Sequence, residues 1–244
     1  MQLSFCHPEF EKEVREQINI FDRAITDNDV LSVVELDLSN FNFKEEDIDT
    51  LFFFINLKSL SINLGSKDQF FWDHFRNIEN LYWVCWGSKV DFRAFSNMKK
   101  LSSLCISGGA YSDIAFENLD ALVFLENLQC LELHEFGHVD LSPLSKMLQL
   151  KSFALRYTHQ AESIATIGMM VWLKELVLDG LYVENLDFLD TLPDTVSIEM
   201  CGIEIYGCND VNVEKWKRFK KRDICEIAVK NEWWYYIDLS PLDE

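Results

Sequence analysis

Residues 128–155 read LQCLELHEFGHVDLSPLSKMLQLKSFAL, and one pattern occurs twice within them. The pattern is L-x-x-L-x-L, and its two copies are Leu128-Leu131-Leu133 and Leu150-Phe153-Leu155. Apolar residues that alternate in this way predict a short strand with one buried face. The segment between the copies carries apolar residues of its own, so we expect it to return and pack against that face.

The pattern recurs along most of the 244-residue chain. The other copies are Val33-Leu36-Leu38, Leu57-Leu60-Ile62, Leu81-Val84-Trp86, Leu101-Leu104-Ile106 and Leu173-Leu176-Leu178, with degenerate copies at Ile198-Met200 and Ile224-Ile227-Val229. The middle positions of successive copies lie 20 to 29 residues apart, which is the period of leucine-rich repeats. One copy cannot bury its apolar face alone, so the copies are expected to stack.

The sequence therefore predicts an α/β fold, a leucine-rich-repeat solenoid. We expect a parallel concave sheet of about nine strands, short helices or 3-10 turns on the convex side, and an N-terminal helical cap. A single domain is expected to cover residues 1–244. Within it we assign residues 1–30 to the N-terminal cap, 31–230 to the repeats and 231–244 to a C-terminal cap.

The chain resembles bacterial leucine-rich-repeat proteins of the internalin type. The resemblance rests on the repeats, on DLSPL at 140–144 and 238–242, and on an opening FEKEVREQI (10–18) that is similar to the family's helical cap. The chain departs from the family where an asparagine normally follows each strand. It also lacks the family's secretion and wall-anchoring signals, so the resemblance implies the fold and not a role in host adhesion.

Composition and charge limit the partners. The formal net charge of −19 repels phosphate backbones and anionic lipid, so we expect no nucleic-acid and no membrane partner. Apolar runs such as residues 51–55 are too short to span a bilayer, and the N-terminus has no secretory signal pattern. Seven cysteines without a C-x-x-C pair favour reduced thiols, which predicts a cytoplasmic location.

The string HEFGH at 134–138 matches the H-E-x-x-H signature of zinc peptidases, which makes a zinc metallopeptidase one alternative. That chemistry needs both histidines on one face of a helix. The repeat instead places His134 at the exit of a strand, so a chance match is the favoured interpretation. We predict no catalytic residues, no metal ligands and no cofactor.

The outward positions of the strands predict a docking face. Trp83 is expected to be its one large aromatic side chain, and Cys85 and Cys105 are expected to be outward neighbours. The full set of predicted protein-binding residues is Glu35, Asp37, Asn63, Trp83, Glu132, His134, Arg156, Tyr157, Glu175, Asp179 and Glu199.

Two binding functions follow from these observations. The first is a non-enzymatic module that binds a protein partner through the concave face, and a basic protein is one candidate for that partner. The second is an acidic inhibitor or immunity protein that neutralises a basic toxin such as a nuclease. A basic segment at 214–222 is either the solvated face of a helix or a site for an acidic partner. The oligomeric state is left open.

Overall fold

A computed structural model gives the fold of the chain. It describes residues 1–43, 45–65, 69–108, 114–158, 160–206, 222–224, 227–230 and 234–235. All of the predicted basic helix at 214–222 except Arg222, and most of the predicted C-terminal cap at 231–244, lie outside these residues. The domain bounds assigned from the sequence therefore stay a prediction.

The main feature is a nine-stranded sheet in which every neighbouring pair is parallel. Its strands, in spatial order, are β1 (Glu35–Asn42), β2 (Ser59–Gly65), β3 (Asn80–Trp86), β5 (Ser103–Ser107), β7 (Cys130–His134), β9 (Ser152–Arg156), β11 (Glu175–Asp179), β13 (Ser197–Cys201) and β15 (Arg222–Ile224). Spatial order follows chain order because each copy of the repeat adds one strand beside the last. The predicted parallel sheet is confirmed.

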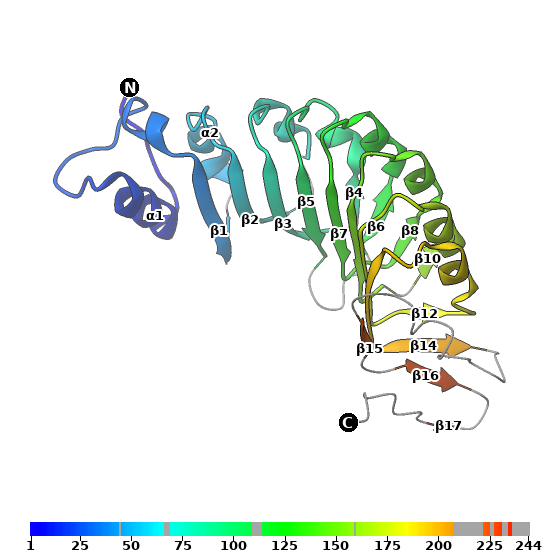
Figure 1. Cartoon of the computed structure of the whole chain (residues 1–244). Coiled ribbons are helices and arrows are strands. Elements are labelled where there is room, and N and C mark those ends of the chain that lie inside the picture. Colours follow the sequence, from blue (N-terminus) through cyan, green and yellow to red (C-terminus); the bar gives the residue numbers. More distant parts are fainter. Residues whose placement is uncertain are drawn as a thin grey trace.

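Helical turns follow the strands and cover the opposite side. They are α2 (Ile48–Leu51) with η2 (Glu45–Asp47), and then η3 (Gln69–His74), η4 (Phe92–Phe95), η5 (Leu119–Phe124), η6 (Ser142–Lys146), η7 (Ile164–Met169) and η8 (Asp187–Thr191). The 3-10 helices from η3 to η8 pack each against the next. Figure 1 shows an arc with the large sheet along its inner side and these turns along its outer side, as the sequence predicts.

Two smaller sheets form where the chain leaves the large one. One is parallel and contains β4 (Lys89–Asp91), β6 (Ala115–Glu117), β8 (His138–Asp140) and β10 (Gln160–Glu162). The other contains β12 (Tyr182–Val183), β14 (Ile203–Tyr206), β16 (Ile227–Lys230) and β17 (Trp234–Tyr235). These sheets were not predicted from the sequence, because their strands are only two to four residues long.

The core is a stack of in-register apolar side chains. Leu131 lies between Leu104 on one side and Phe153 on the other, and all three are fully buried. Burial of a leucine of this kind stabilises the fold by about 1.5–3 kcal/mol. Repetition of this row from strand to strand explains why a sequence with only short elements folds into one continuous core.

Apolar side chains and backbone bonds replace the asparagine ladder that other solenoids place after the strand. Phe136 is fully buried and stacks on Phe116, with ring centroids 4.5 Å apart. The backbone pairing also continues past the strand ends, because Glu135 N donates to the Arg156 carbonyl at 3.0 Å and Tyr157 N donates to the Asp179 carbonyl at 2.7 Å. The turn is therefore held by pairing with the next repeat.

The third copy of the repeat is shifted by three residues from its predicted position. Leu81, not Val84, lies opposite Leu60 and Leu104. The copy therefore reads Ile78-Leu81-Trp83, and all three of these residues are buried. The prediction failed because residues 81–86, LYWVCW, are all apolar or aromatic, so hydrophobicity alone does not fix which of them face inward.

The ninth copy is divided between two sheets. Ile224 lies opposite Met200 in the large sheet, whereas Ile227 pairs with Ile203 in the sheet of β12, β14, β16 and β17. The expectation that Ile227 and Val229 belong to the ninth strand of the large sheet is therefore wrong. Two apolar residues at the right spacing satisfied the pattern although the chain changes sheets between them.

The N-terminal segment forms a helix and a polar network before the first strand. Helix α1 (Pro8–Ile18) buries Phe10, whose ring centroid lies 5.2 Å from that of Phe43. The short helix η1 (Asp29–Ser32) follows. The expected helix is present, while its role as a cap of the solenoid stays a prediction.

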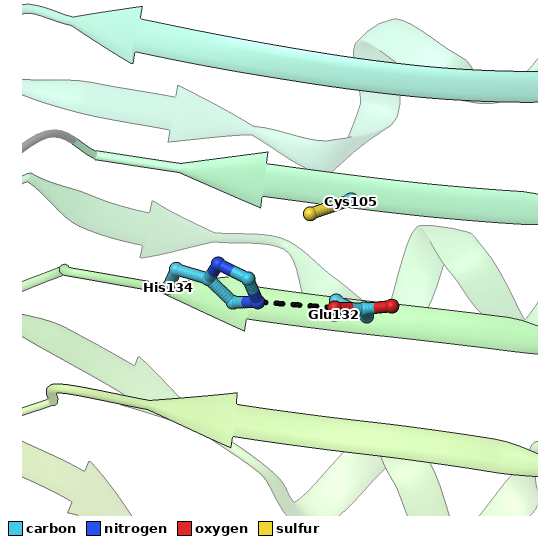
Figure 2. A group of neighbouring side chains, drawn as sticks. All are labelled: Cys105, Glu132 and His134. Atoms are coloured by element: carbon cyan, nitrogen blue, oxygen red, sulfur yellow. Dashed lines mark hydrogen bonds and ion pairs between the residues drawn. The ribbon is translucent and has the colours of Figure 1, made fainter. Parts of the chain in front are cut away.

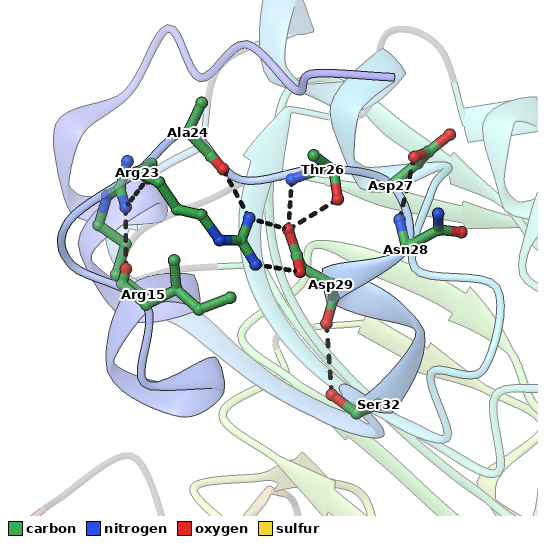
Figure 3. Close-up of polar contacts among 9 residues, drawn as sticks. Arg15, Arg23, Ala24, Thr26, Asp27, Asn28, Asp29 and Ser32 are labelled. Atoms are coloured by element: carbon green, nitrogen blue, oxygen red, sulfur yellow. Dashed lines mark hydrogen bonds and ion pairs between the residues drawn. The ribbon is translucent and has the colours of Figure 1, made fainter.

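Asp29 organises the polar network shown in Figure 3. Its carboxylate accepts two bonds from the Arg23 guanidinium, at 2.7 and 2.8 Å, and one from the Thr26 backbone at 2.8 Å. The Arg23 and Thr26 bonds hold the pKa of Asp29 far below its usual range. Arg15 of α1 donates to the Arg23 carbonyl at 2.9 Å, which ties the helix to this loop.

Among the described residues, no helix is both long enough and apolar enough to cross a bilayer.

Candidate functional site: the concave sheet face

The predicted binding residues occupy one face of the large sheet, with one exception. They stand at outward positions of β1, β2, β7, β9, β11 and β13 or directly after β9. Those placed as expected are Glu35, Asp37, Asn63, Glu132, His134, Arg156, Tyr157, Glu175, Asp179 and Glu199. The exception is Trp83.

Trp83 belongs to the core, and its predicted place on the face is wrong. It is fully buried, its indole lies edge-on to Trp72 with centroids 5.4 Å apart, and its Nε1 donates to the Leu64 carbonyl at 2.9 Å. The three-residue shift of this repeat turns Trp83 inward. The same shift buries Cys85, so the predicted outward pair of Cys85 and Cys105 does not exist.

Tyr82 and Trp86 occupy outward positions on β3, although neither is among the binding residues predicted from the sequence. Their exposed fractions are 37% and 49%. Tyr82 lies beside Cys105 of β5, and Trp86 lies beside Gly65 of β2. A Cβ at Gly65 would come within 2.9 Å of the Trp86 ring, so this glycine lets the indole lie flat across the neighbouring strand. The spacing of Ile78, Leu81 and Trp83 was the signal that could have placed both aromatics.

Tyr157 is the third exposed aromatic of the face, with an exposed fraction of 53%. It has a left-handed backbone conformation, φ 51°, directly after β9. Its ring covers Gly180 of the next repeat, where any Cβ would collide with it. A hydrogen bond with Asp179, and the charge of that carboxylate, raise the pKa of Tyr157. The side chain is thus held at the edge of the face by the repeat that follows.

The centre of the face contains a histidine–glutamate hydrogen bond and an arginine–aspartate ion pair, which together involve three strands. His134 Nε2 lies 3.2 Å from Glu132 Oε2 on β7, and Arg156 of β9 lies 3.4 Å from Asp179 of β11. The hydrogen bond from His134 is the main reason why the pKa of Glu132 is lowered. The structure thus brings four of the predicted residues together, although Glu35 and Asp37 stand at the far end on β1.

The concave face is acidic, and many of the side chains between its charged residues are small. On its first eight strands the outward positions hold six carboxylates, those of Glu35, Asp37, Glu132, Glu175, Asp179 and Glu199, and one guanidinium, that of Arg156. Serines occupy many of the remaining positions, on β2, β5, β9 and β13 among others. A surface of this kind has a negative electrostatic potential.

The HEFGH string is not helical. His134 ends β7 in the large sheet, Glu135 has a left-handed conformation with φ 53°, and His138 begins β8 in a different sheet. His138 pairs with Glu162 of β10 at 2.9 Å. The two histidines are therefore not on a common helical face, and the predicted position of His134 at a strand exit is confirmed.

Comparison with known proteins supports the fold. No model of a known protein family matches the sequence, and no curated protein matches it either. Solved structures do match. Internalin C2 from Listeria monocytogenes is 15% identical, with 91% of this chain and 93% of that chain covered and a TM-score of 0.61.

Two further structures extend the comparison. An internalin (inlF) from the same organism is 14% identical over 93% of this chain and 71% of its own, with a TM-score of 0.63. The leucine-rich-repeat ectodomain of the Arabidopsis receptor kinase HAESA, solved in complex with a peptide hormone, is 18% identical over 84% of this chain and 36% of its own, with a TM-score of 0.53.

These matches define the class of the molecule. The chain has the fold of a leucine-rich-repeat protein. Its predicted resemblance to the internalins is confirmed at the level of the fold, which is what similarity at these identities establishes.

Proposed function

We propose that the chain is a non-enzymatic module that binds a protein or peptide partner through the concave face of the large sheet. The observation that carries the proposal is the set of three exposed aromatic side chains on this face, Tyr82, Trp86 and Tyr157. Tryptophan and tyrosine are the residue types that most often anchor protein interfaces, because they bury a large area at a small entropic cost.

The rigidity of the face supports the same role. Tyr82 and Trp86 stand on β3, which is hydrogen-bonded to β2 on one side and to β5 on the other, so their positions are set before a partner arrives. Preorganisation of this kind lowers the entropic cost of binding. The Arabidopsis ectodomain of the same fold was solved with a peptide hormone bound, which is a precedent for this chain taking a peptide or protein.

The partner that fits best is basic. Six carboxylates face it, two of them on β1 and three on β11 and β13, and the whole chain carries a net charge of −19. This charge favours a second, narrower function, that of an acidic inhibitor or immunity protein for a basic toxin such as a nuclease. Five cysteines of the described residues are free thiols, which agrees with the proposed cytoplasmic location.

Site-specific photo-crosslinking tests the docking face. A photoreactive amino acid is placed at Tyr82 or Trp86 on the concave face and, as a matched control, at Phe124 or Leu148 on the convex side, where the exposed fractions are 68% and 69%. In extracts of the native host, adducts to a defined partner are expected from the first two positions only. Adducts confined to Phe124 and Leu148 would refute the proposal.

Salt dependence tests the basic partner. The association rate of the captured partner is measured at increasing ionic strength, with Asp37→Lys and Glu199→Lys as charge-reversed variants. An acidic face that steers a cation gives an association rate that falls steeply with salt and falls further in both variants. An association rate that changes neither with salt nor with both substitutions would refute the inhibitor hypothesis. The docking face would then still be tested by the crosslinking experiment.

A further inference from the structure

Three side chains with different metal-binding atoms meet at the centre of the concave face. Cys105 of β5 lies directly opposite Glu132 of β7, and His134 is two residues further along β7. All three point to the same side of the sheet, because outward positions alternate along a strand and align between parallel strands. Figure 2 shows the thiol, the carboxylate and the imidazole on this common side.

The distances suit one ion. One ligand atom from each of Cys105, Glu132 and His134 lies within 4.8 Å of the other two. Ligand atoms around a tetrahedral zinc ion lie about 3.3–3.8 Å apart, given bond lengths of about 2.0–2.3 Å. Glu132 and His134 already meet at 3.2 Å, so only the thiol has to come closer. All three side chains are half-buried and leave one side open to the face.

We propose that Cys105, Glu132 and His134 form a zinc site, with the fourth position of the tetrahedron open to water at the concave face. A thiolate with an imidazole selects zinc over magnesium and calcium, which prefer oxygen ligands. The proposal replaces the prediction of no metal ligands. It shares only His134 with the HEFGH string and leaves His138 out.

The surroundings favour a cation. The ionisable groups that face the Cys105 thiol are Tyr82 on β3, Cys130, Glu132 and His134 on β7, and Arg156 on β9. Arg156 is the one positive charge among them, and it is paired with Asp179 on the far side, at 3.4 Å. The net field at the site therefore attracts a divalent ion.

Metal binding at this site releases a proton. Zinc binds a cysteine as the thiolate, so binding at Cys105 displaces the proton of the thiol to solvent. No electron is transferred, and no co-reactant is required. The site does not depend on the proposed docking role, because its ligands all come from this chain.

Zinc titration of the chelator-stripped full chain tests the proposal. Wild type is titrated with zinc against a chromophoric chelator, together with Cys105→Ser, Glu132→Gln and His134→Ala. Loss of a group that merely orients a ligand weakens metal binding about 10–100-fold, so loss of a ligand is expected to weaken it at least about 100-fold. The matched controls His138→Ala and Cys6→Ser are expected to bind zinc as wild type does.

Cobalt provides a readout that reports the thiolate itself. Wild type loaded with Co²⁺ is expected to show a sulfur-to-cobalt charge-transfer band that is absent in Cys105→Ser and retained in Cys6→Ser. Far-ultraviolet circular dichroism of the metal-free variants identifies any that fail to fold. The charge-transfer band of cobalt-loaded wild type tests the site even if a variant does not fold. Wild type without stoichiometric zinc, or zinc binding that survives Cys105→Ser, overturns the site. His138→Ala weakening zinc as much as His134→Ala also overturns it.

Discussion

Replacement of Trp83 and of Trp86 by alanine separates the core of the solenoid from its docking face. The two residues are of one type, three positions apart on the same strand, and the structure gives them opposite places. Trp83 is fully buried, whereas Trp86 is 49% exposed. The substitution Trp83→Ala is therefore expected to destabilise the fold strongly, and Trp86→Ala is expected to leave it nearly intact.

The magnitude follows from the contacts of Trp83. A buried tryptophan removes about 150–250 Å² from water, which corresponds to about 4–6 kcal/mol at 25 cal/mol per Å². Truncation of large aromatic core residues typically costs about 3–5 kcal/mol. The substitution also leaves the Leu64 carbonyl without the Nε1 donor, now at 2.9 Å, which adds about 1 kcal/mol. We expect about 4–5 kcal/mol for Trp83→Ala and about 1 kcal/mol or less for Trp86→Ala.

Urea unfolding followed by far-ultraviolet circular dichroism measures both values without relying on tryptophan fluorescence. Trp83→Phe, which keeps a ring between Trp72 and Phe95, is expected to lie between the two alanine variants. Equal losses for Trp83→Ala and Trp86→Ala, or a larger loss for Trp86→Ala, would refute the assignment of inward and outward residues on β3.

Three more predictions test separate parts of the structure. Gly180→Ala is expected to destabilise the fold by about 1–2 kcal/mol in urea unfolding, because φ is +58° and a Cβ collides with Tyr157; an unchanged midpoint would contradict this packing. Because the pKa of Asp29 is lowered in the folded chain, its carboxylate contributes stability above about pH 4 that is lost as pH falls. The difference in unfolding free energy between wild type and Asp29→Asn should therefore shrink from pH 6 to pH 2. A constant difference would argue against the Arg23 pair. Cys6 is exposed, whereas burial raises the pKa of Cys85 to about 12. Thiol labelling with peptide mapping should therefore modify Cys6 rapidly and Cys85 only on unfolding. Early labelling of Cys85 would place it outside the core.

The repeat predicted most of the fold because its spacing is independent evidence for each strand. Leu104, Leu131 and Phe153 are separated by 27 and 22 residues in the sequence and lie side by side in the sheet. The same spacing placed His134 at a strand exit and so predicted that the HEFGH segment does not form the helix of a zinc peptidase. A local motif can arise by chance, whereas a periodic pattern must agree with its neighbours along the whole chain.

Prediction failed where hydrophobicity did not distinguish the two faces of a strand. Residues 81–86 are uniformly apolar or aromatic, and the inward choice there depends on which ring fits beside Trp72 and Phe95. Packing of this kind is a property of three neighbouring repeats and cannot be read from one of them. The binding aromatics Tyr82 and Trp86 were missed for that reason.

The cysteine, glutamate and histidine of the proposed zinc site were separately assigned to outward positions from the sequence. The repeat also aligned Leu104 with Leu131, and this register sets Cys105 opposite Glu132. What the sequence did not supply is the set of side-chain rotamers that brings the three ligand atoms together. Rotamers are set by the tertiary structure, so the repeat pattern alone does not reveal the site.

Amide-to-amide nuclear Overhauser effects in the deuterated chain test the central claim, that successive repeats stack as parallel strands in one register. The structure predicts cross-strand contacts that place Leu81 beside Leu60 and Leu104, and it predicts no helical contacts through residues 134–138. Contacts that place Val84 opposite Leu104, or a continuous series of helical contacts through 134–138, would contradict the fold and the face derived from it.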